Sequence, residues 1–365
     1  MPKSSDKAIR PVLIASRQTL TLYRLCLKRL LIGLADHSVP SVLVCPQDAD
    51  VQSIVYGPVE VLYHPVFELP LADRLGHGRL VEQLARFKPA VIHSLCQTRA
   101  TLAGTLSRDL GIPYLVSYHA RQRRGLSYVS RRCSGLLCPS EAIMESVRTA
   151  YPRAADRIAV QTLGTYAQEA CCCFSRPRGP ACLVMIHPTG RLDPYATIFH
   201  AIHDLAREGH DLNLVIMSQG REDSPLYRIA KALGINDRIT LLPDLDPWRS
   251  VLGAGDIFLQ PRPTAWFNPY LLEAMGVGLA VAADKACRDD LIRSGETALV
   301  FESDNPVDVR ATLKRLLDQR DLARRIAQTA QDYVRGRHSV SGMVEGFMAA
   351  YRRAAEASRP EAVPA

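Results

Sequence analysis

Several features that define other classes of protein are missing from these 365 residues. The apolar stretches are interrupted by charge, as in residues 20–34 with three basic side chains, and none reaches the roughly 20 uninterrupted apolar residues of a membrane-spanning helix. The first ten residues lack the apolar core of a secretory signal, so we expect a protein that stays in the cytoplasm. A composition of 47% hydrophobic and 22% charged residues excludes extensive disorder.

The ten cysteines lack the paired CxxC spacing of a zinc site, and we interpret them as reduced packing residues. The run Cys171-Cys172-Cys173 has no accompanying histidine spacing, and consecutive residues converge poorly on one tetrahedral ion. No DxD string lies on a suitable loop, since Asp244-Leu245-Asp246 is typical of a turn. We therefore expect no metal.

Two cofactor or partner classes are disfavoured in the same way. Neither half carries GxGxxG after its first strand-like run, which argues against a nicotinamide or flavin enzyme, and no cofactor is expected. The sequence also lacks a zinc finger, an aromatic RNA-binding signature and a recognition-helix pattern, so nucleic acid is not an expected partner.

Short β-rich apolar runs alternate with helical patterns along the chain, which indicates parallel sheets with crossover helices. The first series is PVLIAS at 11, SVLVCP at 41, VEVLYH at 59, AVIHSL at 90, PYLVSYH at 113, GLLCPS at 135 and RIAVQTL at 157. The second is CLVMIHP at 182, LNLVIMS at 212, ITLLP at 239, DIFLQP at 256, LAVAAD at 279 and ALVFE at 298. The fold class predicted is α/β, with two Rossmann-like doubly wound domains facing a central cleft.

The expected domain boundaries follow from composition. Residues 1–165 form the first domain, 166–180 a linker without clear periodicity, and 181–338 the second domain. Residues 339–365 supply a C-terminal helix, a candidate to return to the first domain, and a tail. Because open α/β sheets bind ligands outside the carboxyl ends of their strands, the chemistry is expected in the cleft.

Five segments of the second half occur in a characteristic order. They are TGRLDPY at 189, LVIMSQG at 214 with LYRIAKALGINDRITLLPDL at 226, LGAGDIFLQPR at 252, NPYLLEAMGVGLAVAAD at 268 and LIRSGETALVFESDNPVDVRATLKRLL at 291. Their combination over about residues 182–318 resembles the nucleotide-sugar domain of retaining glycosyltransferases of family 4, which have the GT-B fold. Residues 90–120 and 134–160 resemble, more weakly, the acceptor-side domain of that family.

The segment around residue 268 has a physical interpretation of its own. Asn268 is a favourable N-cap and Pro269 suits the first helical position, so a helix begins where a strand has ended. Its free amides and positive dipole end suit a diphosphate. Glu273 lies one turn further on, and the resemblance assigns such a glutamate to the ribose hydroxyls. The alternative is an ordinary solvated helix glutamate.

Other candidates follow strands. Gly190 permits close backbone approach, and the guanidinium of Arg191 suits phosphate oxygens; the resemblance implies that Arg191 neutralises the departing diphosphate. His119 is the last residue of the run PYLVSYH, which begins at residue 113. It occupies a place where the family often has a histidine near the transferred sugar. His93 and His187 are expected to be structural.

The sequence departs from the family pattern at two positions. Ala265 stands where the first of two glutamates eight positions apart is usual, and Ala196 where a lysine normally partners the arginine. Arg262, Lys285 and Arg288 are candidates to replace that cation, and Arg262 is included in the expected nucleotide-sugar site. Each lost charged contact typically costs about 10² to 10³ in rate.

Two functions therefore stay open. In one, the protein transfers a sugar, with retention of configuration, from a nucleotide-sugar donor to a glycan or lipid-linked acceptor in cell-surface polysaccharide or glycolipid synthesis. In the other, it is an impaired relative that binds nucleotide or glycan or supports a partner enzyme. A sugar-nucleotide epimerase of the same fold has less support.

Charge is distributed unevenly between the halves. Residues 1–165 carry 21 Lys and Arg against 12 Asp and Glu, whereas the remainder carries 24 against 25. Basic residues occur in an expected helix over 19–36 and in the stretch 119–132. Both are candidates to contact an anionic membrane surface, which would make the protein peripheral at the inner face of the membrane. Core packing for the helix, and an anionic acceptor or simple solvation for the stretch, are the alternatives.

Overall fold

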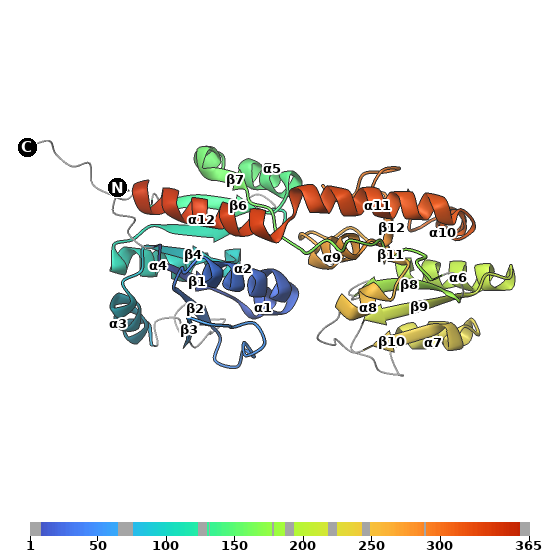
Figure 1. The fold of residues 1–365 in the computed structure, drawn as a ribbon, viewed down its shortest axis with the longest axis horizontal. Helices are drawn as coiled ribbons and strands as arrows, with labels where there is room; N and C mark the ends of the chain where they lie inside the picture. Colours follow the sequence, from blue (N-terminus) through green and yellow to red (C-terminus); the bar gives the residue numbers. More distant parts are fainter. Residues whose placement is uncertain are drawn as a thin grey trace, which may run out of the picture. The chain divides into compact units, whose positions relative to one another are not determined.

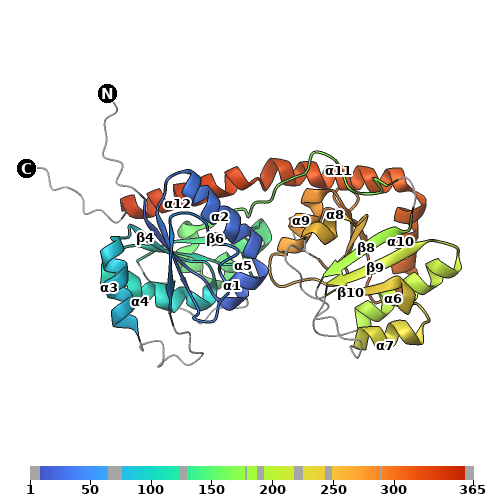
Figure 2. The same ribbon diagram turned by 60° about the horizontal axis from the view of Figure 1, so that its bottom comes forward.

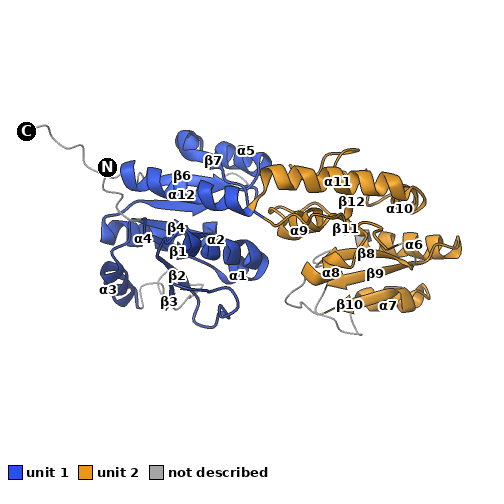
Figure 3. Cartoon of the chain, viewed as in Figure 1, with its two compact units in different colours: residues 1–164, 340–365 blue, residues 165–339 orange. Residues whose placement is uncertain are grey.

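The computed structural model describes residues 9–64, 76–122, 130, 132–176, 179–186, 193–217, 225–242, 249–287 and 290–357. The chain divides into two compact units, residues 1–164 with 340–365 and residues 165–339, which Figure 3 colours separately. Each unit is built on its own sheet.

The first unit contains a seven-stranded sheet. Its strands are β1 (Pro11–Ile14), β2 (Ser41–Cys45), β3 (Val59–Tyr63), β4 (Val91–Ser94), β5 (Tyr114–Ser117), β6 (Cys133–Cys138) and β7 (Ile158–Val160). The order is β3-β2-β1-β4-β5-β6-β7, with parallel pairing throughout. Strands β1, β2, β4 and β5 are buried along their whole length, as expected where helices cover both faces of a parallel sheet.

The helices of the first unit lie on both sides of this sheet (Figure 2). They are α1 (Arg17–Leu22), α2 (Arg24–Asp36), α3 (His77–Phe87), α4 (Ala100–Leu110), α5 (Glu141–Ala150) and α12 (Val340–Ala357), with short 3-10 turns at Gln97–Arg99 and Pro152–Arg157.

The single helix expected over 19–36 is wrong in one respect, because the structure has two helices separated at Tyr23. Ser16 caps α1 by accepting a hydrogen bond from the Thr19 amide at 3.1 Å. Tyr23 has φ −106° and ψ 19°, outside helical geometry, and its ring packs against His119 with 4.2 Å between ring centroids. The break thus places an aromatic ring beside a candidate site residue.

The last helix, α12, packs on α2, β4 and β6 of the first unit (Figure 1). Tyr351 of α12 is fully buried, and its hydroxyl lies 2.8 Å from Nδ1 of His93. The contact with α2 requires a glycine, because a Cβ on Gly33 would lie 2.4 Å from Cγ2 of Val344.

The second unit contains a six-stranded parallel sheet. Its strands are β8 (Ala181–Ile186), β9 (Leu212–Met217), β10 (Ile239–Leu242), β11 (Ile257–Gln260), β12 (Ala280–Asp284) and β13 (Leu299–Phe301). The order is β10-β9-β8-β11-β12-β13. Its helices are α6 (Asp193–Arg207), α7 (Pro225–Ala232), α8 (Arg249–Gly253), α9 (Pro269–Val277), α10 (Pro306–Asp318) and α11 (Arg320–Arg337), with a 3-10 turn at Asn236–Arg238.

Every apolar run predicted as a strand is a strand, and in each sheet the chain starts in the middle and winds outward in both directions. This confirms the expected α/β class with two doubly wound Rossmann-like sheets.

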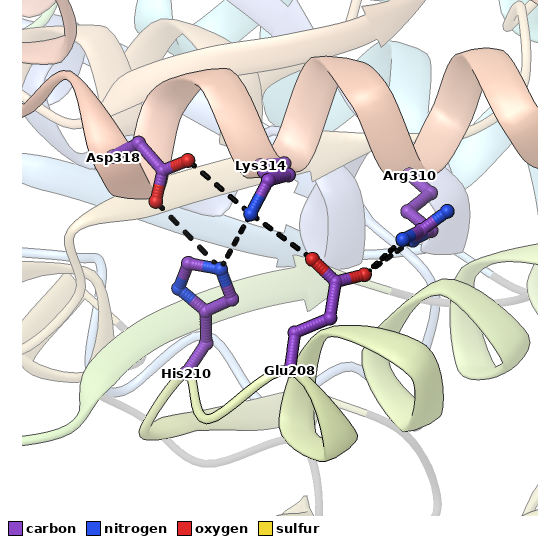
Figure 4. Close-up of polar contacts among 5 residues, drawn as sticks. All are labelled: Glu208, His210, Arg310, Lys314 and Asp318. Atoms are coloured by element: carbon purple, nitrogen blue, oxygen red, sulfur yellow. Dashed lines mark hydrogen bonds and ion pairs between the residues drawn. The ribbon is translucent and has the colours of Figure 1, made fainter.

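A charged cluster joins the end of α6 to α10 in the second unit (Figure 4). Glu208 accepts a hydrogen bond from Nε of Arg310 at 2.7 Å and pairs with Nζ of Lys314 at 3.0 Å. Lys314 also lies 3.4 Å from Asp318 and 3.3 Å from Nε2 of His210. These cations lower the pKa of Glu208, and Glu208 raises the pKa of Lys314.

Candidate functional site

The N-terminus of α9 is fastened to the carboxyl end of β11. Oδ1 of Asn268 accepts hydrogen bonds from the amides of Tyr270 at 3.0 Å and Leu271 at 3.3 Å, and Pro269 takes the first helical position. Nδ2 of Asn268 donates to Oε1 of the buried Gln260 at 3.1 Å. The structure therefore confirms the predicted helix start and its cap, and it fixes that end of the helix at a strand terminus.

Glu273 lies in the middle of α9, where all nine residues are buried, and its side chain is 1% exposed. Its Oε2 pairs with Nη1 of Arg249, the first residue of α8. The same Nη1 donates to Oγ1 of Thr165 at 3.0 Å, and Nη2 of Arg249 donates to the carbonyl of Tyr166. The solvated-glutamate alternative is wrong, because this carboxylate is buried and paired with a cation.

The loop before α9 carries the position where the family pattern is broken. Ala265 is exposed on this loop, and Arg262 is half-buried in it. Phe267 is buried and stacks on His338, with 6.1 Å between ring centroids. Arg262 therefore lies on the loop before α9, Asn268 caps the helix, and Glu273 lies within it.

The phosphate-binding residues expected after β8, Gly190 and Arg191, lie outside the described residues. Ala196 is in α6, so the position where the resemblance expects a lysine carries no charge there. Lys285 pairs with Glu302, which raises its pKa, and Arg288 is outside the described residues.

His119 belongs to the first unit and follows β5. It lines a pocket of ≈ 20 Å³ together with Tyr23, Ser117, Leu163 and other side chains, which leaves room for little more than one water molecule. Burial lowers the pKa of His119 to about 4, because the imidazolium is poorly solvated there. A neutral imidazole is suited to hydrogen-bond a hydroxyl and is not suited to neutralise a phosphate at pH 7.

His93 is a structural residue, as predicted. Its Nδ1 is 2.8 Å from the Tyr351 hydroxyl and its Nε2 is 2.8 Å from Oγ of Ser117, so both ring nitrogens have partners inside the core. Burial, with a smaller effect of His119, lowers the pKa of His93 to about 3. His187 lies outside the described residues.

The cysteines behave as packing residues with free thiols. Cys173 is buried, and Sγ of Cys171 donates to the carbonyl of Gly278 at 3.0 Å. Burial raises the pKa of all three thiols in the run. Within the described ranges, no group of three potential metal ligands converges.

The basic helix α2 of the first unit packs into the core, which was one of the two interpretations of this segment; the other was contact with an anionic membrane surface. Arg29 is 6% exposed and donates to the carbonyl of Gly164 at 3.1 Å. Arg24 lies 3.4 Å from Asp50, and Nζ of Lys28 sits 4.9 Å from the ring centre of Tyr56. In the part of the chain that the structure describes, no helix has the length and hydrophobicity to cross a bilayer.

Arg249 is the residue that sequence reasoning did not find. It lies in a stretch without a motif, 24 residues before Glu273 and 84 after Thr165. One signal was available: a carboxylate within an apolar helix needs a buried partner, although the sequence does not say which cation provides it.

Two family models match the chain in succession. Residues 26–165 match the model for Glycosyltransferase Family 4, and residues 184–333 match the model for Glycosyl transferases group 1. The curated protein D-inositol 3-phosphate glycosyltransferase from Nocardia farcinica is 32% identical over 131 residues, which is 34% of this chain and 29% of that protein. The matched stretches span between 29% and 57% of the length of the curated relatives.

Solved structures match over nearly the whole chain. A glycosyltransferase from Rickettsia africae has a TM-score of 0.80 at 13% identity, covering 95% of this chain and 98% of that one. Anabaena Alr3699/HepE in complex with UDP and glucose has a TM-score of 0.73 at 15% identity, covering 93% and 98%. At these identities the likeness concerns the fold.

Proposed function

The chain belongs to the family 4-like glycosyltransferases of the GT-B fold, since its two halves match the two family models in order, and from this membership we propose that it transfers a sugar from a nucleotide-sugar donor to an acceptor. We further propose that the transfer retains the configuration of the sugar. The capped start of α9, with Glu273 one turn inside it, is the observation that carries the proposal.

The donor binds to the second unit. The positive end of the α9 dipole attracts the diphosphate, while the carboxylate of Glu273 accepts hydrogen bonds from the ribose hydroxyls. UDP-sugars are the first donors to test, because Anabaena Alr3699/HepE was crystallised with UDP and with UDP-glucose.

Cleavage of the bond between sugar and phosphate leaves a nucleoside diphosphate anion. Gly190 permits close approach of the backbone, and Arg191 stabilises the developing negative charge, with Arg262 as a second cation on the loop before α9. His119, neutral at pH 7, hydrogen-bonds a hydroxyl of the transferred sugar.

The acceptor is a glycan or a lipid-linked molecule of cell-surface polysaccharide or glycolipid synthesis. The excess of basic residues in the first 165 residues supports an anionic acceptor or peripheral contact with an anionic membrane. Because Arg29 of α2 is buried, the stretch 119–132 is the better source of such contact. Flotation with anionic liposomes at low salt measures it, and equal flotation with neutral liposomes would contradict it.

A noncatalytic role is the second candidate, and Ala265 and Ala196 favour it. An unreactive relative would keep nucleotide binding through α9 and Glu273 while lacking one sugar contact and one phosphate cation.

A thermal-shift screen of nucleoside diphosphates and their sugars tests donor binding, because a ligand that prefers the folded state raises the melting temperature. Donor hydrolysis or transfer then separates the enzyme from the binding protein. If the wild type binds the donor without hydrolysing it, and the variant carrying Ala265→Glu and Ala196→Lys gains activity, these two positions explain the missing activity.

A further inference from the structure

The carboxylate of Glu273 is held by a network within the second unit. Its side chain is 1% exposed, and apolar residues flank it along α9, so water does not solvate its charge. Arg249 pairs with Oε2 from the start of α8. A buried carboxylate that lost its cation would be strongly destabilised, so the pair with Arg249 stabilises the position of Glu273 within the fold.

The guanidinium of Arg249 is itself fixed. Its Nη1 donates to Oγ1 of Thr165 at 3.0 Å as well as to Glu273, and its Nη2 donates to the carbonyl of Tyr166. The arginine therefore joins α9 to the segment at 165–166 through a planar group with few rotational choices. Lysine has one nitrogen and cannot reproduce this fork.

We propose that Arg249 is a positioning residue that orients the Glu273 carboxylate for the ribose diol of the donor nucleotide and thereby sets discrimination between ribose and deoxyribose. This inference rests on the proposed nucleotide-sugar function. A carboxylate has about four acceptor sites, so it can accept hydrogen bonds from several donors at once.

The orientation matters because discrimination depends on geometry. A carboxylate fixed within hydrogen-bond reach of a hydroxyl gains from that hydroxyl, and a hydrogen bond to a charged group corresponds to about tenfold or more in affinity. A carboxylate free to rotate loses part of this difference. The ratio of the dissociation constants for a 2′-deoxynucleotide and the ribonucleotide therefore reports the position of Glu273 separately from the stability of the fold.

The experiment uses isothermal titration of the full chain with UDP, GDP and ADP and with their 2′-deoxy counterparts. The variants are Arg249→Gln, Arg249→Lys and Glu273→Gln. Arg238→Gln is the matched control, because Arg238 also belongs to the second unit, lies 3.6 Å from a carboxylate of Asp211 and donates to the Leu212 carbonyl at 3.3 Å.

The wild type should prefer the ribonucleotide by about tenfold, and the Arg249 and Glu273 variants should reduce the ratio to about threefold or less. The Arg238 control should keep the wild-type ratio. If Arg249→Gln does not fold, Arg249→Lys decides the matter, because it preserves the positive charge beside Glu273.

The possible outcomes distinguish failure of this inference from failure of the proposed nucleotide-sugar function. Failure of the wild type to bind any of the diphosphates would overturn both. Wild-type binding without ribose preference would overturn the inference while donor binding stands. Preserved discrimination in both Arg249 variants, with its loss in Glu273→Gln, would show that Arg249 does not position the carboxylate.

Discussion

The two units share the order of their first six strands, and the examples below differ in what shifts the pKa of their titratable groups. In the first, burial of neutral groups lowers the pKa of His93 to about 3 and of His119 to about 4 and raises that of Tyr351. In the second, ionic partners lower the pKa of Glu208 and raise that of Lys285. The same topology thus holds neutral hydrogen-bonded side chains such as His93 in one unit and exposed ion pairs such as those of Glu208 and Lys285 in the other.

The largest expected effect comes from removing the cation proposed to stabilise the diphosphate in the second unit. Arg191→Ala should lower turnover by about 10² to 10³ because it removes a cation from the developing diphosphate. Steady-state kinetics with the donor found by thermal shift measures it, and Arg238→Ala is the control. Turnover within about threefold of the wild type would remove Arg191 from the proposed mechanism.

Acid should weaken the first unit through His93 and His119. Their folded pKa values lie below the ordinary 6.5, so the unfolded state binds more protons, and stability present above 6.5 is lost as the pH falls toward 4 and 3. From about pH 7.5 to about pH 5, each histidine should remove about 2 kcal/mol from the free energy of unfolding.

Native-state hydrogen exchange in β4 and β5, corrected for intrinsic rates, measures this loss in the first unit. His93→Gln should flatten the pH dependence, whereas His77→Gln, whose ring pairs with Asp109 nearer the surface, should leave it unchanged. The same slope in both variants would contradict the assignment to His93.

A comparison of two helix caps tests whether the start of α9 binds the nucleotide. Asn268→Ala should lower the stability of the second unit by about 1 kcal/mol and also weaken nucleotide binding. Asn305 caps α10 in the same way, accepting from the amides of Val307 at 3.1 Å and Asp308 at 3.3 Å. Asn305→Ala should cost similar stability in thermal denaturation and leave nucleotide affinity unchanged; equal losses of affinity would contradict a site at α9.

The smallest expected effect concerns the charged cluster of Figure 4. Lys314→Met removes the cation shared by Glu208 and Asp318 and should lower the melting temperature slightly. The difference from wild type should shrink at about 0.5 M salt, because exposed ion pairs are screened. A difference that persists at high salt would point to packing of the lysine stem instead.

Local sequence patterns predicted the strands of both sheets and the start of α9. The strands follow from apolar runs, and the start of α9 follows from Asn268 and Pro269, because caps and strand preferences act over a few residues. The break at Tyr23 was missed because apolar periodicity continues through it. The partners of Glu273 and His93 could not be predicted, since Arg249 and Tyr351 reach them through the tertiary fold, the latter across 258 residues.

Hydrogen exchange of the full chain, with and without saturating UDP, tests most directly whether the second unit holds the nucleotide at α9. We expect slower exchange in the loop and first turn at 261–271, with no comparable protection in β1 to β7 of the first unit. Protection confined to the first unit, with residues 261–271 unchanged when UDP is bound, would contradict it.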